Sequence, residues 1–368
     1  MKVTLVGAGN LGHTIFKLLT RRGFDTRLVT SKPEIWKSVT ALRDVNMTTL
    51  VNIPTSAVTS DYSATRDADM IIVSSPVNAY ESILSKLQPK KNATICTTFQ
   101  CPYIDQLTKH MWPQANGLHL QYVPFQAKII VPGKSSHIVG WKDYLEYIGN
   151  DDAAQRLSLM LGATNEPIRK HPLAFVLTTS NPILHMPCYY TLFHPWDGSY
   201  PTQVGKKHKI PGSLYKNMNE ESADLIQALN DEVMLIQRLI EEGSQEIIGV
   251  EPLIQRVQYQ YGDQVGDYTS LHSMFNTATM YEKSSISYIK YPDGQLLPDV
   301  TSRHFTDDVP FGLMPIKELA LKYGILQTPV LDTLIFWAQR VMKTRYLLNS
   351  QTVSPNYKLF NSIKQNNL

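Results

Sequence analysis

The chain has 368 residues, of which 43% are hydrophobic, and its 35 Lys and Arg residues nearly balance 32 Asp and Glu residues. This length allows two domains with full cores, and the near-balanced charge, without a dense basic tract, argues against a nucleic-acid-binding protein. No apolar run has the length needed to cross a bilayer, and a strand predicted at residues 2–6 leaves no room for a signal peptide. Three scattered cysteines lack metal-ligand spacing, so we expect a cytoplasmic protein with no membrane partner and no metal site.

The N-terminal stretch has the order of a dinucleotide-binding unit. An apolar strand at residues 2–6 runs into a G-x-G-x-x-G turn, and the amphipathic helix that follows ends at Gly23. In this pattern the first glycine allows the tight turn, the second lets the backbone approach a pyrophosphate, and the third lets the helix lie close to the strand. The N–H groups at the start of the helix then face the phosphates. The predicted cofactor contacts in this turn are Gly7, Gly9, Asn10, Leu11 and Gly12.

The end of the second predicted strand, residues 25–30, indicates which dinucleotide is used. An NAD site usually has Asp or Glu at this point, which binds the ribose hydroxyls. Here the chain has Thr30, Ser31 and Lys32, a set of hydroxyls and a cation that suits the 2′-phosphate of NADP. Glu34 lies two residues further on and is a carboxylate of the kind that an NAD site uses, so NAD is the alternative cofactor. We therefore favour NADP over NAD and assign Thr30, Ser31 and Lys32 to the cofactor site.

A strand at residues 68–73, apolar without interruption from Met70 to Val73, contributes further candidate cofactor contacts. Such a strand is typical of a parallel sheet that is buried on both faces. In doubly wound sheets, the loops at the carboxyl ends of the strands line the ligand crevice. Ser74, Ser75 and Pro76 follow this strand directly, so we assign them to the cofactor site.

Strands and helices alternate up to about residue 165, and helical periodicity then takes over. The remaining elements of the first half are expected at 93–99, 118–123, 128–141 (strands at the sheet edge) and 151–161 (a helix). The alternation predicts a doubly wound, mostly parallel α/β domain of the Rossmann type at residues 1–165. The helical periodicity predicts an all-α substrate domain at residues 166–368.

The longest predicted helix, residues 219–243, has apolar residues at steps of three and four that form one stripe, and Asn219 is placed to cap it. Other helices are predicted at 251–260, 270–276, 315–323 and 328–348. Residues 301–313 differ from their surroundings because they place an arginine, a histidine and two aspartates between apolar helices. Pro310 and Gly312 predict that this segment is a loop, and a polar loop between core helices is either solvated or functional.

Three motifs resemble the octopine/nopaline (opine) dehydrogenase family. The first is GAGNLG at residues 7–12, and the second is Asn-Pro-Ile-Leu-His at residues 181–185. The third is Arg-His-Phe-Thr-Asp-Asp-Val-Pro-Phe-Gly-Leu at residues 303–313. It is close to the family's pattern, which has an arginine and an aromatic residue before an acidic pair and a Val/Ile-Pro-aromatic-Gly-Leu ending, with His304 inserted. The resemblance covers most of the chain.

The resemblance implies a two-domain enzyme whose helical domain is of the 6-phosphogluconate dehydrogenase C-terminal type. It implies coupling of an α-keto acid, usually pyruvate, to the amine of an amino acid, with hydride from NAD(P)H. His185 takes the role of general acid and base, Asp308 orients it, and Arg303 binds a substrate carboxylate. Asn181 either orients the substrate or caps a turn, and His304 is interpreted as a surface histidine. A homodimer is expected from frequency alone.

Two other classes stay open at this point. Two-domain reductases of the ketopantoate or glycerol-3-phosphate type use a lysine where the helical domain begins, and this chain has no lysine between residues 173 and 205. A sensor that binds NADP without turnover would suit a chain that had lost its His, Asp and Arg set, but all three residues are present. The fold alone does not separate these functions.

Overall fold

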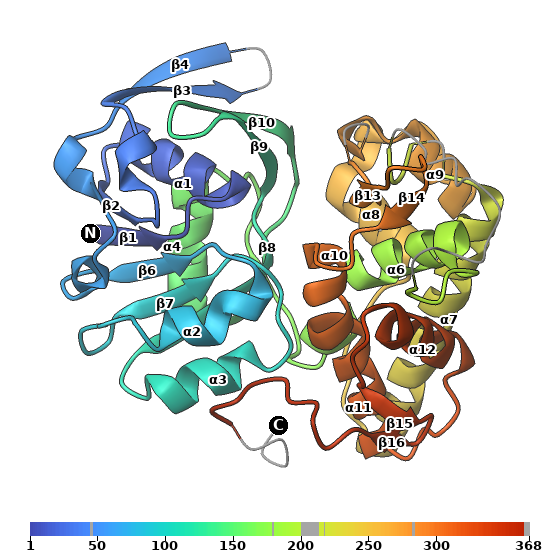
Figure 1. Ribbon diagram of the computed structural model, residues 1–368. Coiled ribbons are helices and arrows are strands. Elements are labelled where there is room, and N and C mark those ends of the chain that lie inside the picture. Colours follow the sequence, from blue (N-terminus) through green and yellow to red (C-terminus); the bar gives the residue numbers. More distant parts are fainter. Residues whose placement is uncertain (45–46, 179, 200–212, 217, 282–283, 364–368) are drawn as a thin grey trace. The chain divides into compact units, whose positions relative to one another are not determined.

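The computed structural model describes residues 1–44, 47–178, 180–199, 213–216, 218–281 and 284–363 (Figure 1). The chain forms two compact units. Unit 1 comprises Met1–Lys170 together with the C-terminal segment that begins at Phe360, and unit 2 comprises His171–Leu359. The C-terminal segment is held within unit 1 by Glu81, whose carboxylate accepts the backbone N–H groups of Asn361 at 3.0 Å and Ser362 at 2.5 Å.

Unit 1 is built on an eight-stranded sheet with the order β12-β11-β8-β7-β6-β1-β2-β5 (Figure 1). All neighbouring strands are parallel except the antiparallel pair β8 and β11. Every residue of β6 and β7 is buried, as expected for the centre of a parallel sheet covered on both faces. The strands are β1 Lys2–Val6, β2 Asp25–Val29, β5 Val58–Thr59, β6 Met70–Val73, β7 Thr94–Thr97, β8 Asn116–Tyr122, β11 Glu146–Gly149 and β12 Ile168–Arg169. The predicted doubly wound, mostly parallel α/β fold is confirmed.

The helices of unit 1 are α1 Asn10–Arg21, α2 Tyr80–Leu84, α3 Ile104–Met111 and α4 Asp151–Leu161. Helix α1 buries an apolar face that includes Ile15, Phe16 and Leu19. Helix α4 begins at a cap in which the Asn150 side chain accepts the N–H of Ala153 at 2.8 Å. These helices supply the apolar contacts that a sheet buried on both faces requires.

A second sheet, which the sequence did not predict as a separate element, packs against α1. Its order is β4-β3-β10-β9, with β3 Val39–Asp44, β4 Met47–Asn52, β9 Phe125–Val131 and β10 Ser135–Trp141. The prediction that residues 128–141 extend the edge of the main sheet was therefore wrong. These residues do form strands, but β10 pairs with β3, because strand periodicity indicates which face is buried and does not specify the partner.

Unit 2 is mainly helical (Figure 1). Its helices are α5 Ala174–Leu177, α6 Ser180–Phe193, α7 Glu220–Ser244, α8 Leu253–Tyr261, α9 Leu271–Thr277, α10 Arg303–Thr306, α11 Met314–Lys322 and α12 Pro329–Val341. Two small hairpins accompany them: β13 Tyr288–Lys290 with β14 Leu296–Pro298, and β15 Leu347–Asn349 with β16 Thr352–Val353. Helix α7 has the predicted buried stripe, and the Asn219 side chain caps it by accepting the N–H of Ser222 at 3.0 Å.

The last helix is shorter than the sequence predicted. Helix α12 ends at Val341, whereas the apolar pattern predicted a helix that continues to about residue 348. Lys343 has a φ of +54°, which ends a right-handed helix, and the apolar residues that follow belong to strand β15. Among the helices that the structure describes, none combines the length and apolarity needed to span a membrane.

Candidate active site and cofactor cradle

The glycine turn of unit 1 has a distinct steric role for each glycine. Gly7 has a φ of +101°, and a Cβ there would collide with the backbone carbonyl of Ser74. A Cβ on Gly12 would collide with the carbonyl of Gly7. A Cβ on Gly9 would meet no atom of the described residues within 4 Å. Gly7 and Gly12 therefore allow β1, α1 and the loop after β6 to pack closely, whereas the space beside Gly9 is open for a ligand to approach the backbone.

The start of α1 is arranged to bind an anion. Gly9 is the N-cap and provides no side-chain cap, so the first N–H groups of the helix remain available to a phosphate. The side chain of Asn10 is used elsewhere, because its Oδ1 accepts the N–H of Ile129 in β9 at 2.8 Å. A contact from Asn10 to a cofactor is therefore limited to its backbone N–H. Leu11 is half-buried against the core of unit 1.

The predicted contacts after β6 lie beside this turn, since β1 and β6 are neighbouring strands. Ser74 is 3% exposed, and its Oγ is buried without a hydrogen-bond partner among the described residues. Ser75 is half-buried, with its Oγ 2.6 Å from where a Cβ on Gly7 would lie, and Pro76 is exposed. A buried hydroxyl without a partner among the described residues, in a residue that packs against Gly7 and Gly12 of the turn, fits a polar ligand such as a dinucleotide pyrophosphate.

The predicted ribose-side contacts follow β2. Ser31 and Lys32 are exposed, and Thr30 is half-buried with its Oγ1 accepting the N–H of Lys32 at 3.4 Å. Glu34 lies in the short 3₁₀ turn Pro33–Ile35 and is also exposed. Arg27, on the same strand, is committed to an ion pair with Asp67 at 3.2 Å. Thr30, Ser31 and Lys32 therefore form an exposed polar cluster with one cation.

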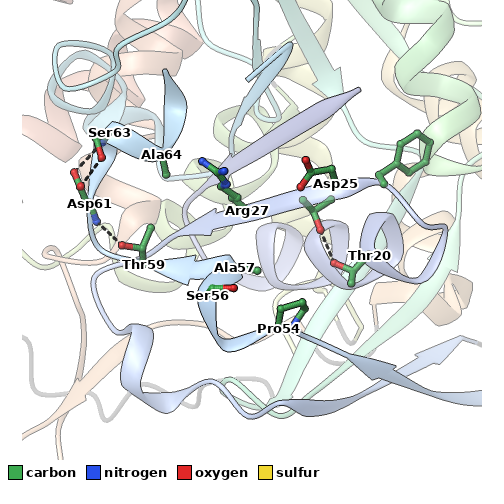
Figure 2. Close-up of a pocket in the computed structure, with 12 residues that line it drawn as sticks. Thr20, Asp25, Arg27, Pro54, Ser56, Ala57, Thr59, Asp61, Ser63 and Ala64 are labelled. Atoms are coloured by element: carbon green, nitrogen blue, oxygen red, sulfur yellow. Dashed lines mark hydrogen bonds between the residues drawn. The ribbon is translucent and has the colours of Figure 1, made fainter. Parts of the chain in front are cut away.

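Unit 1 also contains a cavity of about 600 Å³ beside β2 and β5. In Figure 2 the backbone N–H of Asp61 donates to Oγ1 of Thr59, and the Asp61 carboxylate accepts the N–H of Ser63. The hydroxyls of Thr20 and Thr26 also lie 2.7 Å apart. None of its twelve lining residues belongs to the glycine turn or to the predicted contacts after β2 and β6. This cavity therefore does not belong to the candidate cofactor site.

Two of the sequence motifs come together in unit 2. Helix α6 carries His185, and Asp308 directly precedes the π-helical turn η7, Val309–Leu313. The Nδ1 atom of His185 lies 2.6 Å from Oδ2 of Asp308, and both side chains are buried. A Cβ on Gly312 would collide with the ring of Pro182. The glycine of one motif and the proline of the other thus allow α6 and η7 to approach closely enough for the His–Asp contact.

The prediction that residues 301–313 form a loop was wrong. Residues 303–306 form α10, and η7 leads directly into α11. Pro310 stands in the first turn of η7, where its missing N–H costs no hydrogen bond. The N–H of Leu313 donates to the carbonyl of Asp308 at 2.9 Å, which is the wider i to i+5 spacing of a π turn.

Burial sets the charge state of the His185–Asp308 pair. Burial lowers the pKa of His185, and the neighbouring cation of Arg303 lowers it further. Burial also raises the pKa of the Asp308 carboxyl. Neither charge is favoured alone in this environment, so the pair is most stable with one proton held between Nδ1 and Oδ2. The other ring nitrogen, Nε2, is left for proton exchange with a substrate.

The two predicted substrate contacts lie close to this pair in the sequence and are exposed. Arg303 begins α10, and its guanidinium has no hydrogen bond or ion pair within the part of the chain that the structure describes. Its charge nevertheless affects the pKa values of His185, His304 and Asp308, so it is near them. Asn181 lies in the first turn of α6. Within the described residues, no group of three or more His, Cys, Asp or Glu side chains is placed to hold a metal.

His304 is not the surface residue that the sequence suggested. It is 8% exposed, and its ring centroid lies 4.3 Å from that of His185. Its Nδ1 atom is 2.8 Å from the hydroxyl of Tyr189, a residue that sequence reasoning missed. A usable signal was present, because Tyr189 lies four residues after His185 and therefore on the same face of a helix. Tyr215, whose ring centroid is 6.0 Å from that of His185, gave no such signal.

The α/β unit with its dinucleotide-type glycine turn, and the helical unit with its buried His–Asp pair, define a two-domain oxidoreductase of the NAD(P)-dependent class. Residues 168–342 match the family model described as NAD/NADP octopine/nopaline dehydrogenase, alpha-helical domain. Residues 2–98 match a model described as NADP oxidoreductase, coenzyme F420-dependent. The helical unit therefore matches the octopine/nopaline dehydrogenase domain, and the chain is similar to opine dehydrogenases over most of its length.

Relatives and solved structures agree with this assignment. A tauropine dehydrogenase of Arabella iricolor is 25% identical, over 95% of this chain and 93% of the relative. An octopine dehydrogenase of Mizuhopecten yessoensis is also 25% identical, over 95% and 92%. The solved structure of octopine dehydrogenase in complex with NADH and agmatine has a TM-score of 0.82 at 20% identity, covering 98% of this chain and 94% of that one. At that identity the structural likeness shows the fold.

Proposed function

We propose that the chain is an opine-type dehydrogenase, which condenses an α-keto acid such as pyruvate with the amino group of an amino acid and reduces the product with NAD(P)H. The observation that carries this proposal is the buried His185–Asp308 pair, 2.6 Å apart, with the unpaired guanidinium of Arg303 nearby. This set offers a proton shuttle and a carboxylate anchor, the two functions that the condensation needs from the protein.

The reaction joins the amine nitrogen to the keto carbon. The carbonyl oxygen leaves as water, which gives an imine, and addition of a hydride and a proton then gives a secondary amine. When bound, the dinucleotide supplies the hydride. The glycine turn and the Ser74 hydroxyl are the groups that would hold its pyrophosphate.

The protein's own part is to move protons and to hold the substrates. With Nδ1 held by Asp308, His185 uses Nε2 to accept the proton of the attacking amine and to donate it to the departing oxygen. The Asp308 carboxylate stabilises the imidazolium that forms between these steps. Arg303 binds the carboxylate of the keto acid through two parallel N–H donors. Asn181, four residues before His185 on the same helix, orients the amino acid.

NADP is the preferred cofactor in this proposal. It is supported by the exposed cation Lys32 and the hydroxyls of Thr30 and Ser31 after β2, where no carboxylate stands to repel a 2′-phosphate. The test is fluorescence titration of NADPH and NADH against the protein and against Lys32→Ala. We expect Lys32→Ala to weaken NADPH binding about tenfold and to leave NADH binding unchanged. Equal losses for both dinucleotides would contradict the assignment.

The experiment for the main proposal follows NADPH oxidation with pyruvate and a panel of amino acids, each substrate also alone. We expect oxidation only when both substrates are present, and Arg303→Lys should raise the KM for pyruvate at least tenfold because a single ammonium cannot make the paired contact. Oxidation with a keto acid alone would indicate a simple 2-ketoacid reductase instead. Tight NADPH binding without turnover for any pair would indicate a sensor.

A further inference from the structure

His304 and Tyr189 form a second polar layer against the His185–Asp308 pair. The ring of His304 packs on that of His185, with centroids 4.3 Å apart and planes 53° apart. Helix α6 carries both His185 and Tyr189, and α10 carries His304. Tyr189 is completely buried and His304 is nearly so. The two histidines therefore lie in one enclosed space, and only His185 takes part in the proposed chemistry.

The hydrogen bonds of Tyr189 select one tautomer of His304. The hydroxyl of Tyr189 accepts the N–H of Ser287 at 2.8 Å, and its own proton can go to Nδ1 of His304 at 2.8 Å or to the carbonyl of Ser287 at 3.3 Å. The shorter distance favours donation to His304. Nδ1 of His304 is then an acceptor, so the proton of the neutral ring resides on Nε2.

His304 remains uncharged in this environment. Burial lowers its pKa to about 3, and the neighbouring His185 lowers the pKa further; Asp308 raises it to a smaller extent, and the smallest effect is a lowering by Arg303. Burial also raises the pKa of Tyr189 well above its usual range, so its hydroxyl keeps the proton that it donates. A neutral ring can lie against His185 without repelling the imidazolium that forms there during proton transfer.

We propose that His304, held by Tyr189, is a positioning residue for His185: its fixed ring confines the imidazole of His185 to the orientation in which Nδ1 meets Asp308 and Nε2 is presented to substrate. This role rests on the proposed function, because proton transfer by His185 is the reason for confining its ring. Its physical basis is that reacting groups lose rate steeply when their geometry loosens. Tyr189 acts through His304 and not on the substrate.

Three variants distinguish the effect of the His304 ring from the effect of its hydrogen bond to Tyr189. Tyr189→Phe removes the hydroxyl and keeps both histidine rings. His304→Phe keeps an aromatic ring against His185 and removes the acceptor. His304→Asn removes the ring but retains an oxygen that can accept from Tyr189. Tyr190→Phe is the matched control, because it deletes a hydroxyl one residue along α6. Within the described residues, the ring of Tyr190 packs against His194 and Trp337 and not against His185 or His304.

The kinetic expectation is a selective loss in kcat. Tyr189→Phe and His304→Phe should each lower kcat about tenfold with KM changed less than twofold, and the double variant should lose about tenfold and not a hundredfold, because both changes break the same restraint. Loss of the ring contact in His304→Asn should lower kcat at least as much. Tyr190→Phe should match the parent protein. Independent, multiplying losses in the double variant would overturn the proposal.

A second measurement does not depend on turnover and separates this proposal from the proposed function. The hydrogen-bonded Nδ1–H of His185 should give a downfield proton resonance that exchanges slowly with solvent. We expect exchange at least tenfold faster in Tyr189→Phe and His304→Phe than in the parent and Tyr190→Phe. If no substrate pair is turned over but the exchange rates change as stated, the proposed function fails and the positioning of His185 stands. Unchanged exchange in both variants overturns the positioning role, whatever the activity.

Discussion

Replacing Asp308 by Asn tests how much the buried carboxylate contributes to proton transfer by His185. The side chains are nearly isosteric, and the amide oxygen can still accept from Nδ1, which is 2.6 Å from Oδ2 in the native protein. The substitution therefore keeps most of the packing and removes the charge. It also lets the amide nitrogen face Nδ1, which favours the wrong tautomer of His185.

The size of the effect follows from the charge that His185 gains when it takes up a proton. With charge centres about 4 Å apart and an effective dielectric constant of about 20, the carboxylate stabilises the imidazolium by about 4 kcal/mol. At about 1.4 kcal/mol for each factor of ten, loss of this interaction lowers kcat by about a thousandfold. The binding of NADPH should not change, because the glycine turn lies in unit 1.

The assay is steady-state NADPH oxidation with saturating keto acid and amino acid, accompanied by fluorescence titration of NADPH. Asp307→Asn is the matched control, since it removes the same charge one residue away and leaves the His185 contact intact. We expect Asp307→Asn to stay within about threefold of the parent. If Asp308→Asn retained more than a tenth of the parent kcat, the carboxylate would not be stabilising a catalytic imidazolium, and the reasoning would fail.

Gly9→Ala should weaken NADPH binding by at least tenfold at a nearly unchanged melting temperature, because the added Cβ would meet no described atom of the protein. Gly7→Ala should lower the melting temperature as well, because its Cβ would collide with the Ser74 carbonyl. Equal melting temperatures for the two variants would argue against these roles. Burial lowers the pKa values of His13 and His119 from 6.5 to about 3. Between these values the unfolded chain binds more protons than the folded one, so each histidine should lower the free energy of unfolding by about 1.4 kcal/mol for each pH unit below 6.5; urea titrations at several pH values check this, and a flat profile contradicts it. The Nζ of Lys317, which is fully buried, lies 2.7 Å from Oδ1 of Asp332. Lys317→Met should therefore cost about 3–5 kcal/mol in urea unfolding, and a loss below 1 kcal/mol would mean that the partner charge is resolvated.

The elements that were predicted correctly are those whose structure is indicated by residues close together in the sequence. The strand, glycine turn and helix of residues 2–21 follow one another directly, and the turn needs glycine at Gly7 because of its positive φ. Helix α7 has both a stripe of buried residues and a side-chain cap at Asn219. The pairing of His185 with Asp308 was inferred from a family resemblance between two motifs, since no local pattern links residues 123 positions apart.

The features that the sequence did not predict depend on contacts between distant segments. Strands β9 and β10 join β3 in a separate sheet because α1 offers them a surface, a choice that alternation of apolar residues cannot specify. Pro310 and Gly312 indicate a loop by composition, yet the proline fits a first turn and the glycine allows contact with Pro182. His304 looks like a surface residue until α10 turns its ring toward His185.

The most direct test of the central claim follows the atoms of the two substrates into the product. The protein is incubated with NADPH deuterated at the transferable position, pyruvate and a ¹⁵N-labelled amino acid, and the products are analysed by mass spectrometry. We predict one product that contains the labelled nitrogen, the carbons of both substrates and one deuterium on the former keto carbon. Deuterated lactate beside unchanged amino acid would contradict reductive coupling and would show that the site reduces the keto acid alone.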